Sequence, residues 1–124
     1  METLHLAGQL AELPAARHWV AEALAARQVG AELSQIIVML ADELLANAIT
    51  HGSPPFSLSL EFADGHVRCE VADGSNYLPA LGHSNPTETS GRGLELVAKL
   101  ATRWGTEIEG LGKKVWFELD ANAA

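Results

Sequence analysis

The most informative stretch of this sequence is residues 31–52, which read AELSQIIVMLADELLANAITHG. At about 100° per residue, its apolar side chains fall on one stripe of a helix. The centre of that stripe is formed by Leu33, Ile37, Leu40 and Leu44. Gly52 and the two prolines that soon follow are typical of a helix end. The stretch therefore predicts a long helix over residues 31–51, with its apolar face on a core.

Two polar side chains lie at the edge of this stripe. Asn47 falls within about 60° of the apolar centre, and Glu43 lies just beyond it on the same flank. Because they are four residues apart, their side chains are neighbours on the helix surface. An amide beside a core-facing stripe needs a partner, since an unpaired buried polar group costs about 1–3 kcal/mol. A bound Mg2+ with its waters would satisfy both groups; a half-exposed Asn47, bonded to nearby backbone, is the alternative.

The other elements are predicted by hydrophobic spacing and by turn residues. Pro14 suits the first turn of a helix, and the Asp64-Gly65 pair is typical of a hairpin turn. Alternating apolar residues on either side of that turn predict two strands. The expected helices are residues 14–28, 31–51 and 93–104. The expected strands are residues 3–7, 56–62, 67–71, 105–109 and 113–119.

The order of these elements predicts the fold class. A chain of 124 residues is the size of one domain, so residues 1–124 are expected to form a single unit. Helices and hairpin-linked strands are segregated along the sequence. We therefore expect an α+β two-layer sandwich, in which three helices pack on one face of a mixed, mainly antiparallel sheet.

Two further features are candidates for ligand binding. Asp73 ends a strand, where its carboxylate could accept a hydrogen bond from an exocyclic amine such as that of adenine, or could simply begin a turn. Residues 73–91 lack periodicity, and loops of that length are often lids or binding loops. Gly91-Arg92-Gly93 opens the last helix, where glycines and helix N–H groups favour phosphate, although loop-to-helix flexibility explains them equally.

Composition limits the classes of partner. The chain has 16 acidic residues against 8 lysines and arginines, a formal net charge of −8, which argues against direct nucleic-acid binding. A free nucleotide is still compatible, because Mg2+ and backbone N–H groups can neutralise its phosphates.

The single cysteine, Cys69, excludes an intrachain disulfide. The start of the chain does not resemble a signal peptide, and the densest apolar run stops at Asp42-Glu43, so we expect a cytoplasmic protein without membrane contact.

Three segments resemble the sequence boxes of the gyrase, chaperone and histidine-kinase ATPase superfamily. Residues 43–52, ELLANAITHG, resemble its N-box; residues 71–75, VADGS, resemble its first glycine box. Residues 91–97, GRGLELV, resemble its second glycine box. The tail, residues 103–119, is similar to the short branch of anti-sigma-factor serine/threonine protein kinases. The resemblance extends over nearly the whole chain and implies the Bergerat-type ATPase fold.

The resemblance also implies a role for each matched position. Asn47 would coordinate Mg2+, Glu43 would act as the general base, and Asp73 would bond the adenine amine. Gly91 and Gly93 would frame the phosphates. The same resemblance makes ATP and Mg2+ the expected cofactors.

Arg92 would be a cation close to those phosphates. Kinases of this branch sequester a sigma factor and transfer the γ-phosphate of ATP to a serine of an anti-anti-sigma factor. The resemblance therefore implies a Mg-ATP-dependent serine protein kinase with these two protein partners, present as a homodimer.

Some positions depart from the pattern of the superfamily. Ser75 and Tyr77 stand where the first glycine box has glycines, and Lys113 stands where a threonine often supports the adenine-binding aspartate. Residues 74–90 contain no lysine or arginine for the γ-phosphate. Two alternatives therefore stay open: a non-catalytic protein-binding module of the same fold with weak or no nucleotide binding, and an interaction domain in which the motifs are coincidental.

Overall fold

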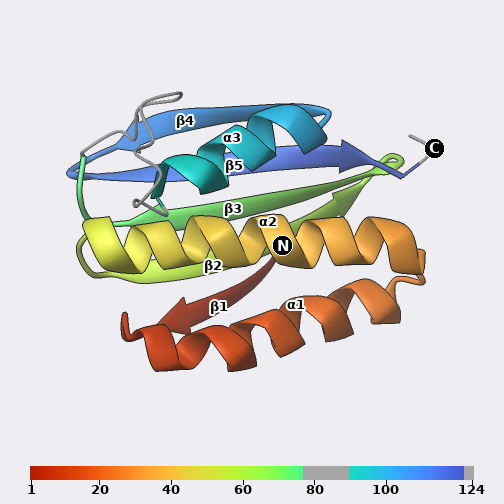
Figure 1. Cartoon of the computed structure of the whole chain (residues 1–124), viewed down its shortest axis with the longest axis horizontal. Helices are drawn as coiled ribbons and strands as arrows, with labels where there is room; N and C mark the ends of the chain where they lie inside the picture. Colours follow the sequence, from red (N-terminus) through yellow and green to blue (C-terminus); the bar gives the residue numbers. More distant parts are fainter. Residues whose placement is uncertain (77–89, 122–124) are drawn as a thin grey trace.

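The computed structural model describes residues 1–76 and 90–121, with the side chains of residues 90–92 outside the description. A layer of helices lies on one side of a single sheet (Figure 1). The helices are η1 (Leu10–Glu12), α1 (Leu13–Ala26), α2 (Ala31–His51) and α3 (Ser90–Leu100), the first being one turn of 3-10 helix. The strands are β1 (Glu2–Leu6), β2 (Phe56–Ala63), β3 (His66–Asp73), β4 (Arg103–Glu109) and β5 (Gly112–Asp120).

The five strands form one sheet in the order β1-β2-β3-β5-β4, and each of the four pairings is antiparallel. The β2–β3 hairpin turns at Asp64 and Gly65, which both have positive φ angles. Two of these pairings, β1 with β2 and β3 with β5, join strands that are distant in sequence. The predicted fold class, three helices on one face of a mainly antiparallel sheet, is confirmed.

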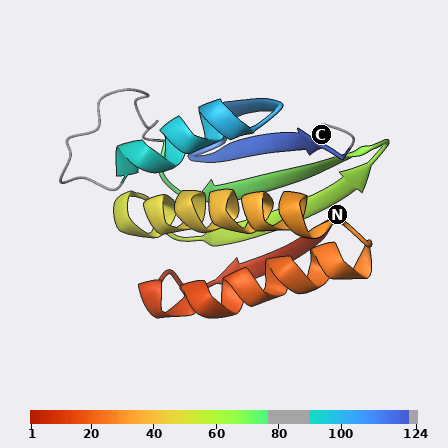
Figure 2. The same ribbon diagram turned by 45° about the vertical axis from the view of Figure 1, so that its right-hand side comes forward.

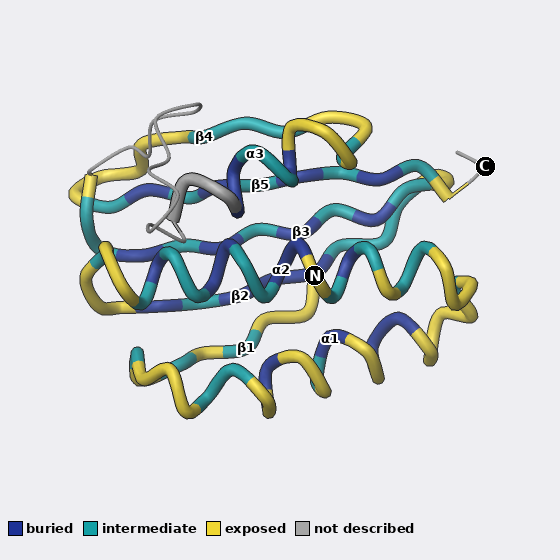
Figure 3. The backbone as a smooth tube through the Cα atoms, in the orientation of Figure 1, coloured by how far each residue is buried: buried dark blue, intermediate teal, exposed yellow. Residues whose placement is uncertain are grey.

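The core lies between the two layers, and α2 is its central helix. In two views α2 runs between α1 and α3, and it contacts both of them as well as β2 and β3 (Figures 1 and 2). Dark blue, buried segments recur along α2 and along the central strands (Figure 3). The residues that α2 buries are Ile37, Leu40, Ala41, Leu44, Leu45 and Ala48.

By length and composition alone, α2 is long and apolar enough to cross a membrane. Central helices of globular cores have the same composition, because they are apolar on more than one side. In this fold α2 packs against the sheet and against both neighbouring helices.

The end of α3 differs from the prediction. Residues 93–104 were expected to be helical, but α3 ends at Leu100, and Arg103 and Trp104 begin β4. Pairing with β5 explains the difference, since Arg103 lies opposite Glu118 and Trp104 opposite Phe117. The helical spacing of the apolar residues continued past the end of the helix because Trp104 packs on the same core from a strand.

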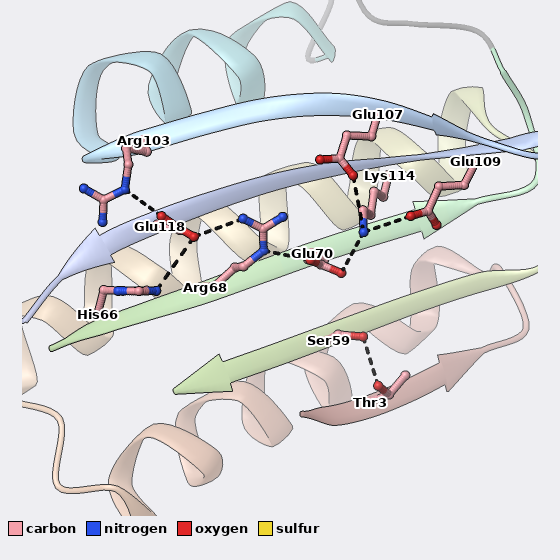
Figure 4. Close-up of polar contacts among 10 residues, drawn as sticks. All are labelled: Thr3, Ser59, His66, Arg68, Glu70, Arg103, Glu107, Glu109, Lys114 and Glu118. Atoms are coloured by element: carbon pink, nitrogen blue, oxygen red, sulfur yellow. Dashed lines mark hydrogen bonds and ion pairs between the residues drawn. The ribbon is translucent and has the colours of Figure 1, made fainter. Parts of the chain in front are cut away.

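The sheet face opposite the helices carries a network of ion pairs (Figure 4). Glu118 is shared by two guanidinium groups: its Oε1 lies 2.6 Å from Nε of Arg103, and its Oε2 lies 3.0 Å from Nη1 of Arg68. The Arg68 guanidinium also lies 4.1 Å from the ring centroid of Trp116. The hydrogen bond from Arg103, together with that from Arg68, holds the pKa of Glu118 below its ordinary value.

Candidate functional site

The first part of the site is the contact between α2 and the start of α3. Gly93 is buried against the C-terminal half of α2. A Cβ atom at position 93 would lie 2.7 Å from Nδ2 of Asn47 and 3.2 Å from Cβ of Glu43. A larger residue here would require the Asn47 side chain or the start of α3 to shift, because real Cβ atoms essentially never come so close to a neighbouring atom. The structure therefore places the second glycine of Gly91-Arg92-Gly93 directly on the Glu43 and Asn47 pair.

Glu43 and Asn47 are both half-buried on α2, between its fully buried core positions. A half-buried position suits a side chain that must be held in place and yet reach a ligand. Their carboxylate and amide oxygens are hard donors of the kind that Mg2+ prefers. Mg2+ normally takes only one or two protein ligands and completes its shell with water and substrate phosphates. The residues at this position therefore fit a magnesium ion that arrives with a nucleotide.

The second part of the site is the end of β3. The side chain of Asp73 is almost fully buried, with 2% exposed, and its Oδ2 lies 2.8 Å from Nζ of Lys113 on β5. The other carboxylate oxygen, Oδ1, accepts a hydrogen bond of 2.7 Å from the backbone N–H of Ser75. Asp73 therefore begins a turn, as its sequence position suggested, and is also one half of a buried ion pair.

Two glycines approach the end of β3 closely, Gly52 after α2 and Gly112 at the start of β5. A Cβ atom at Gly52 would lie 2.6 Å from Cγ of Asp73, and one at Gly112 would contact the backbone carbonyl of Asp73. Gly52 closes α2 with a hydrogen bond of 2.7 Å from its N–H to the carbonyl of Ala48. The helix that carries Asn47 is thus packed against Asp73 through Gly52, the residue that follows its last turn.

These two contacts define one end of the domain as the candidate site. Asn47 and Gly52 are five residues apart, which is about 7.5 Å along a helix axis. The predicted metal position and the predicted base position therefore lie at the same end of α2. Gly91 lies in the first turn of α3, while the side chain of Arg92 and all of Tyr77 lie outside the described residues.

Sequence reasoning noted Lys113 only as a departure and missed its ion pair with Asp73. The available signal was the alternation along β5, in which residues 113, 115, 117 and 119 face the core. A lysine on that apolar face requires an acidic partner, because an unpaired buried charge is strongly unfavourable. The partner could not be read from the sequence, since it depends on the register between β3 and β5.

In the described part of the chain, no group of three or more histidine, cysteine, aspartate or glutamate side chains could hold a metal ion by itself. A magnesium site made by the protein alone is therefore not formed by these residues. A site completed by nucleotide phosphates needs only the pair on α2.

Comparison with known proteins identifies the family of the chain. Residues 6–119 match the family described as histidine kinase-like ATPase domain. A curated relative, an uncharacterized protein of Streptomyces coelicolor, is 37% identical over 73 residues, which are 55% of this chain and 70% of the relative.

Among solved structures, the chain is similar to the histidine kinase domain from the Erythrobacter litoralis EL346 blue-light activated histidine kinase. The TM-score is 0.58 at 20% identity, and the match covers 88% of this chain. The chain spans 61% of that solved domain, so the likeness concerns the fold.

The family match includes all three sequence boxes, from residue 43 to residue 97. This excludes the interpretation in which the motifs are coincidental in an unrelated interaction domain. This chain belongs to the histidine kinase-like ATPase domain family.

Proposed function

We propose that this protein is an ATP-binding anti-sigma factor that sequesters a sigma factor and phosphorylates a serine of an anti-anti-sigma partner. The observation that carries the proposal is the contact of Gly93 with Asn47 and Glu43. This contact brings the start of α3, which would bind the phosphates, next to the two α2 side chains that would bind the metal ion. The resemblance of residues 103–119 to the anti-sigma-factor kinases favours this branch of the family.

In this proposal the phosphates and the adenine of ATP are bound by different residues. Asn47 holds the Mg2+ that accompanies ATP, and that ion offsets the charge of the phosphates. The N–H groups at Gly91 and Gly93 face the phosphates at the start of α3, with Arg92 as the nearby cation. Asp73 accepts a hydrogen bond from the adenine amine.

Glu43 is the general base of the proposed phosphoryl transfer. Its carboxylate accepts the proton of the substrate serine hydroxyl while the serine oxygen bonds to the γ-phosphorus. The bond between that phosphorus and the oxygen that bridges it to the β-phosphate breaks, and ADP leaves. The products are ADP, phosphoserine and a protonated Glu43.

Calorimetry tests the nucleotide site directly. ATP and ADP would be titrated into wild type and Asn47→Ala, each with and without Mg2+. We expect wild type to bind more tightly when Mg2+ is present, and Asn47→Ala to lose that difference. An absence of binding heat from both nucleotides in folded wild-type protein would refute the ATP site.

The kinase step needs its own experiment. Transfer of labelled phosphate from ATP to a cognate anti-anti-sigma protein would be measured with wild type and Glu43→Gln. General-base catalysis contributes about 10²–10⁴-fold, so we expect a rate loss in that range with ATP affinity retained. Equal rates for the two proteins would remove Glu43 from the chemistry.

A second candidate is a non-catalytic module of the same fold. It is favoured by the Asp73–Lys113 contact of 2.8 Å, because a carboxylate with a built-in partner needs no ligand to balance its charge. Ser75, in place of a glycine, favours it too. This candidate predicts stable binding of a sigma factor that is unchanged by ATP, and no phosphoryl transfer to a partner that demonstrably binds.

The remaining parts of the proposal concern partners and location. We propose a cytoplasmic homodimer that contacts neither nucleic acid nor membrane, and whose acidic surface faces basic patches of the sigma factor. The formal charge of −8 supports this choice of partner. Light scattering would test the dimer, and salt-dependent binding of a sigma factor would test the charge complementarity.

A further inference from the structure

Lys113 is a buried cation at the position where the proposed function places the nucleobase. Its side chain is 8% exposed, and its ammonium lies 2.8 Å from Oδ2 of Asp73. Asp73 is its partner in the described part of the chain. An ammonium has three N–H donors, and among the described residues one of them is given an acceptor, Oδ2 of Asp73.

The carboxylate of Asp73 also keeps capacity for a ligand. Its two oxygens together offer about four lone-pair sites. One is used by Lys113 and one by the N–H of Ser75. The buried pair therefore presents an acceptor and a donor side by side, with no net charge between them.

We propose that Lys113 is a specificity-determining residue that donates a hydrogen bond to a ring nitrogen of the bound adenine, next to the exocyclic amine that Asp73 accepts. The inference rests on the proposed function, because it assumes that ATP binds at this site. Adenine carries a ring nitrogen acceptor on each side of its amine, N1 on one and N7 on the other. Either nitrogen places a hydrogen-bond acceptor beside the amine donor, which is the pattern that Lys113 and Asp73 together would recognise.

The electrostatics favour this arrangement. A lone buried charge is strongly unfavourable, whereas a balanced pair can bind a neutral base without leaving either charge uncompensated. A hydrogen bond to a charged donor is about twice as strong as one between neutral groups. Lys113 would therefore contribute more to base recognition than a hydroxyl group at the same position.

The deciding experiment changes single atoms of the ligand. Binding of ATP, 1-deaza-ATP, 7-deaza-ATP and GTP to wild-type protein would be measured by calorimetry with Mg2+. We expect one of the two deaza analogues to bind about tenfold or more weakly than ATP, since it lacks the acceptor for the ammonium. The other analogue should bind like ATP, and this identifies which ring nitrogen Lys113 contacts.

Lys113→Met then tests whether the lysine is the donor. It keeps the length of the side chain and removes its N–H groups, so ATP and both deaza analogues should bind with equal affinity. Lys113→Gln, which keeps an N–H donor without the charge, should restore part of the discrimination. A purely structural role of Lys113 would lower all affinities together and leave their ratios unchanged.

The outcomes separate this inference from the proposed function. If ATP binds and neither analogue differs from it, the inference is wrong while the ATP site stands. Tighter binding of GTP than of ATP would also overturn it, because a guanine carbonyl would then be the acceptor. If Lys113→Met does not fold, the affinities of wild-type protein for ATP and the two deaza analogues still test the inference. Failure of every nucleotide to bind would remove the proposed function itself.

Discussion

A methyl group at position 93 would lie 2.7 Å from Nδ2 of Asn47, so it fits between α2 and α3 only if the Asn47 side chain or the start of α3 moves. The contact also fixes the distance between the predicted metal ligand and the predicted phosphate-binding turn. Neither helix can shift at this point without changing the site.

Gly93→Ala should therefore weaken nucleotide binding. The added methyl forces either the Asn47 side chain or the start of α3 to move, and such overpacking costs about 1–3 kcal/mol. We expect ATP affinity to fall about tenfold or more, measured by calorimetry with Mg2+.

Gly30→Ala is the matched control, since a Cβ atom at Gly30 would meet nothing within 4 Å. This variant should bind ATP like wild type. If Gly93→Ala also binds like wild type while remaining folded, the contact between the two helices has no part in the site.

The pKa of Glu118 predicts a loss of stability in acid. Its pKa is lowered in the folded protein, first by the hydrogen bond from Arg103 and then by that from Arg68. The stabilisation is therefore fully present above the ordinary glutamate pKa of about 4.3 and is lost as pH falls through the lower folded value. We expect the melting temperature to fall below about pH 4.3.

Glu118→Gln should lower the melting temperature at pH 7 and flatten its dependence on pH in the acid range. Glu22→Gln serves as the control, because the Glu22 side chain is 71% exposed on α1. A Glu118→Gln protein that matches wild type at pH 7 would mean that the shared carboxylate does not stabilise the sheet.

Leu40 tests the central position of α2. Its side chain is fully buried in the core, and Leu40→Ala should cost about 2–5 kcal/mol in the free energy of unfolding. Leu111→Ala, at a residue that is 88% exposed, should stay within about 0.5 kcal/mol of wild type. Urea denaturation measures both, and equal midpoints would contradict the assignment of α2 as the core helix.

The burial of Cys69 predicts slow reaction of the folded protein with thiol reagents. It is fully buried on β3, and burial raises the pKa of its thiol. Since the thiolate is the reactive form, a thiol reagent at pH 8 should label native protein far more slowly than protein in urea. Rapid labelling without denaturant would show that β3 is accessible from the core side.

Much of the fold could be predicted because its signals are local. The alternation around Asp64-Gly65 gave the β2–β3 hairpin, and the stripe centred on Ile37 gave α2 with the observed end at His51. The last helix was placed too far along the chain, because Trp104 continues an apolar spacing that in the structure belongs to a strand.

The candidate site could be predicted only in part, for a related reason. Glu43 and Asn47 are four residues apart on one helix, so their proximity follows from helix geometry. The approach of Gly93 to Asn47 and of Lys113 to Asp73 depends on tertiary packing and strand register. Residue spacing along the chain does not determine either of these.

The pairing of β3 with β5 has a consequence for how the protein folds. Asp73 and Lys113 are 40 residues apart, whereas each of the two hairpins joins neighbouring segments. Contacts distant in sequence form late, because the entropy of closing a long loop must be lost before they contribute. We therefore expect the end of the domain that carries Asp73 and Lys113 to form after the two hairpins, so that a chain still emerging from the ribosome acquires it only once β5 is complete.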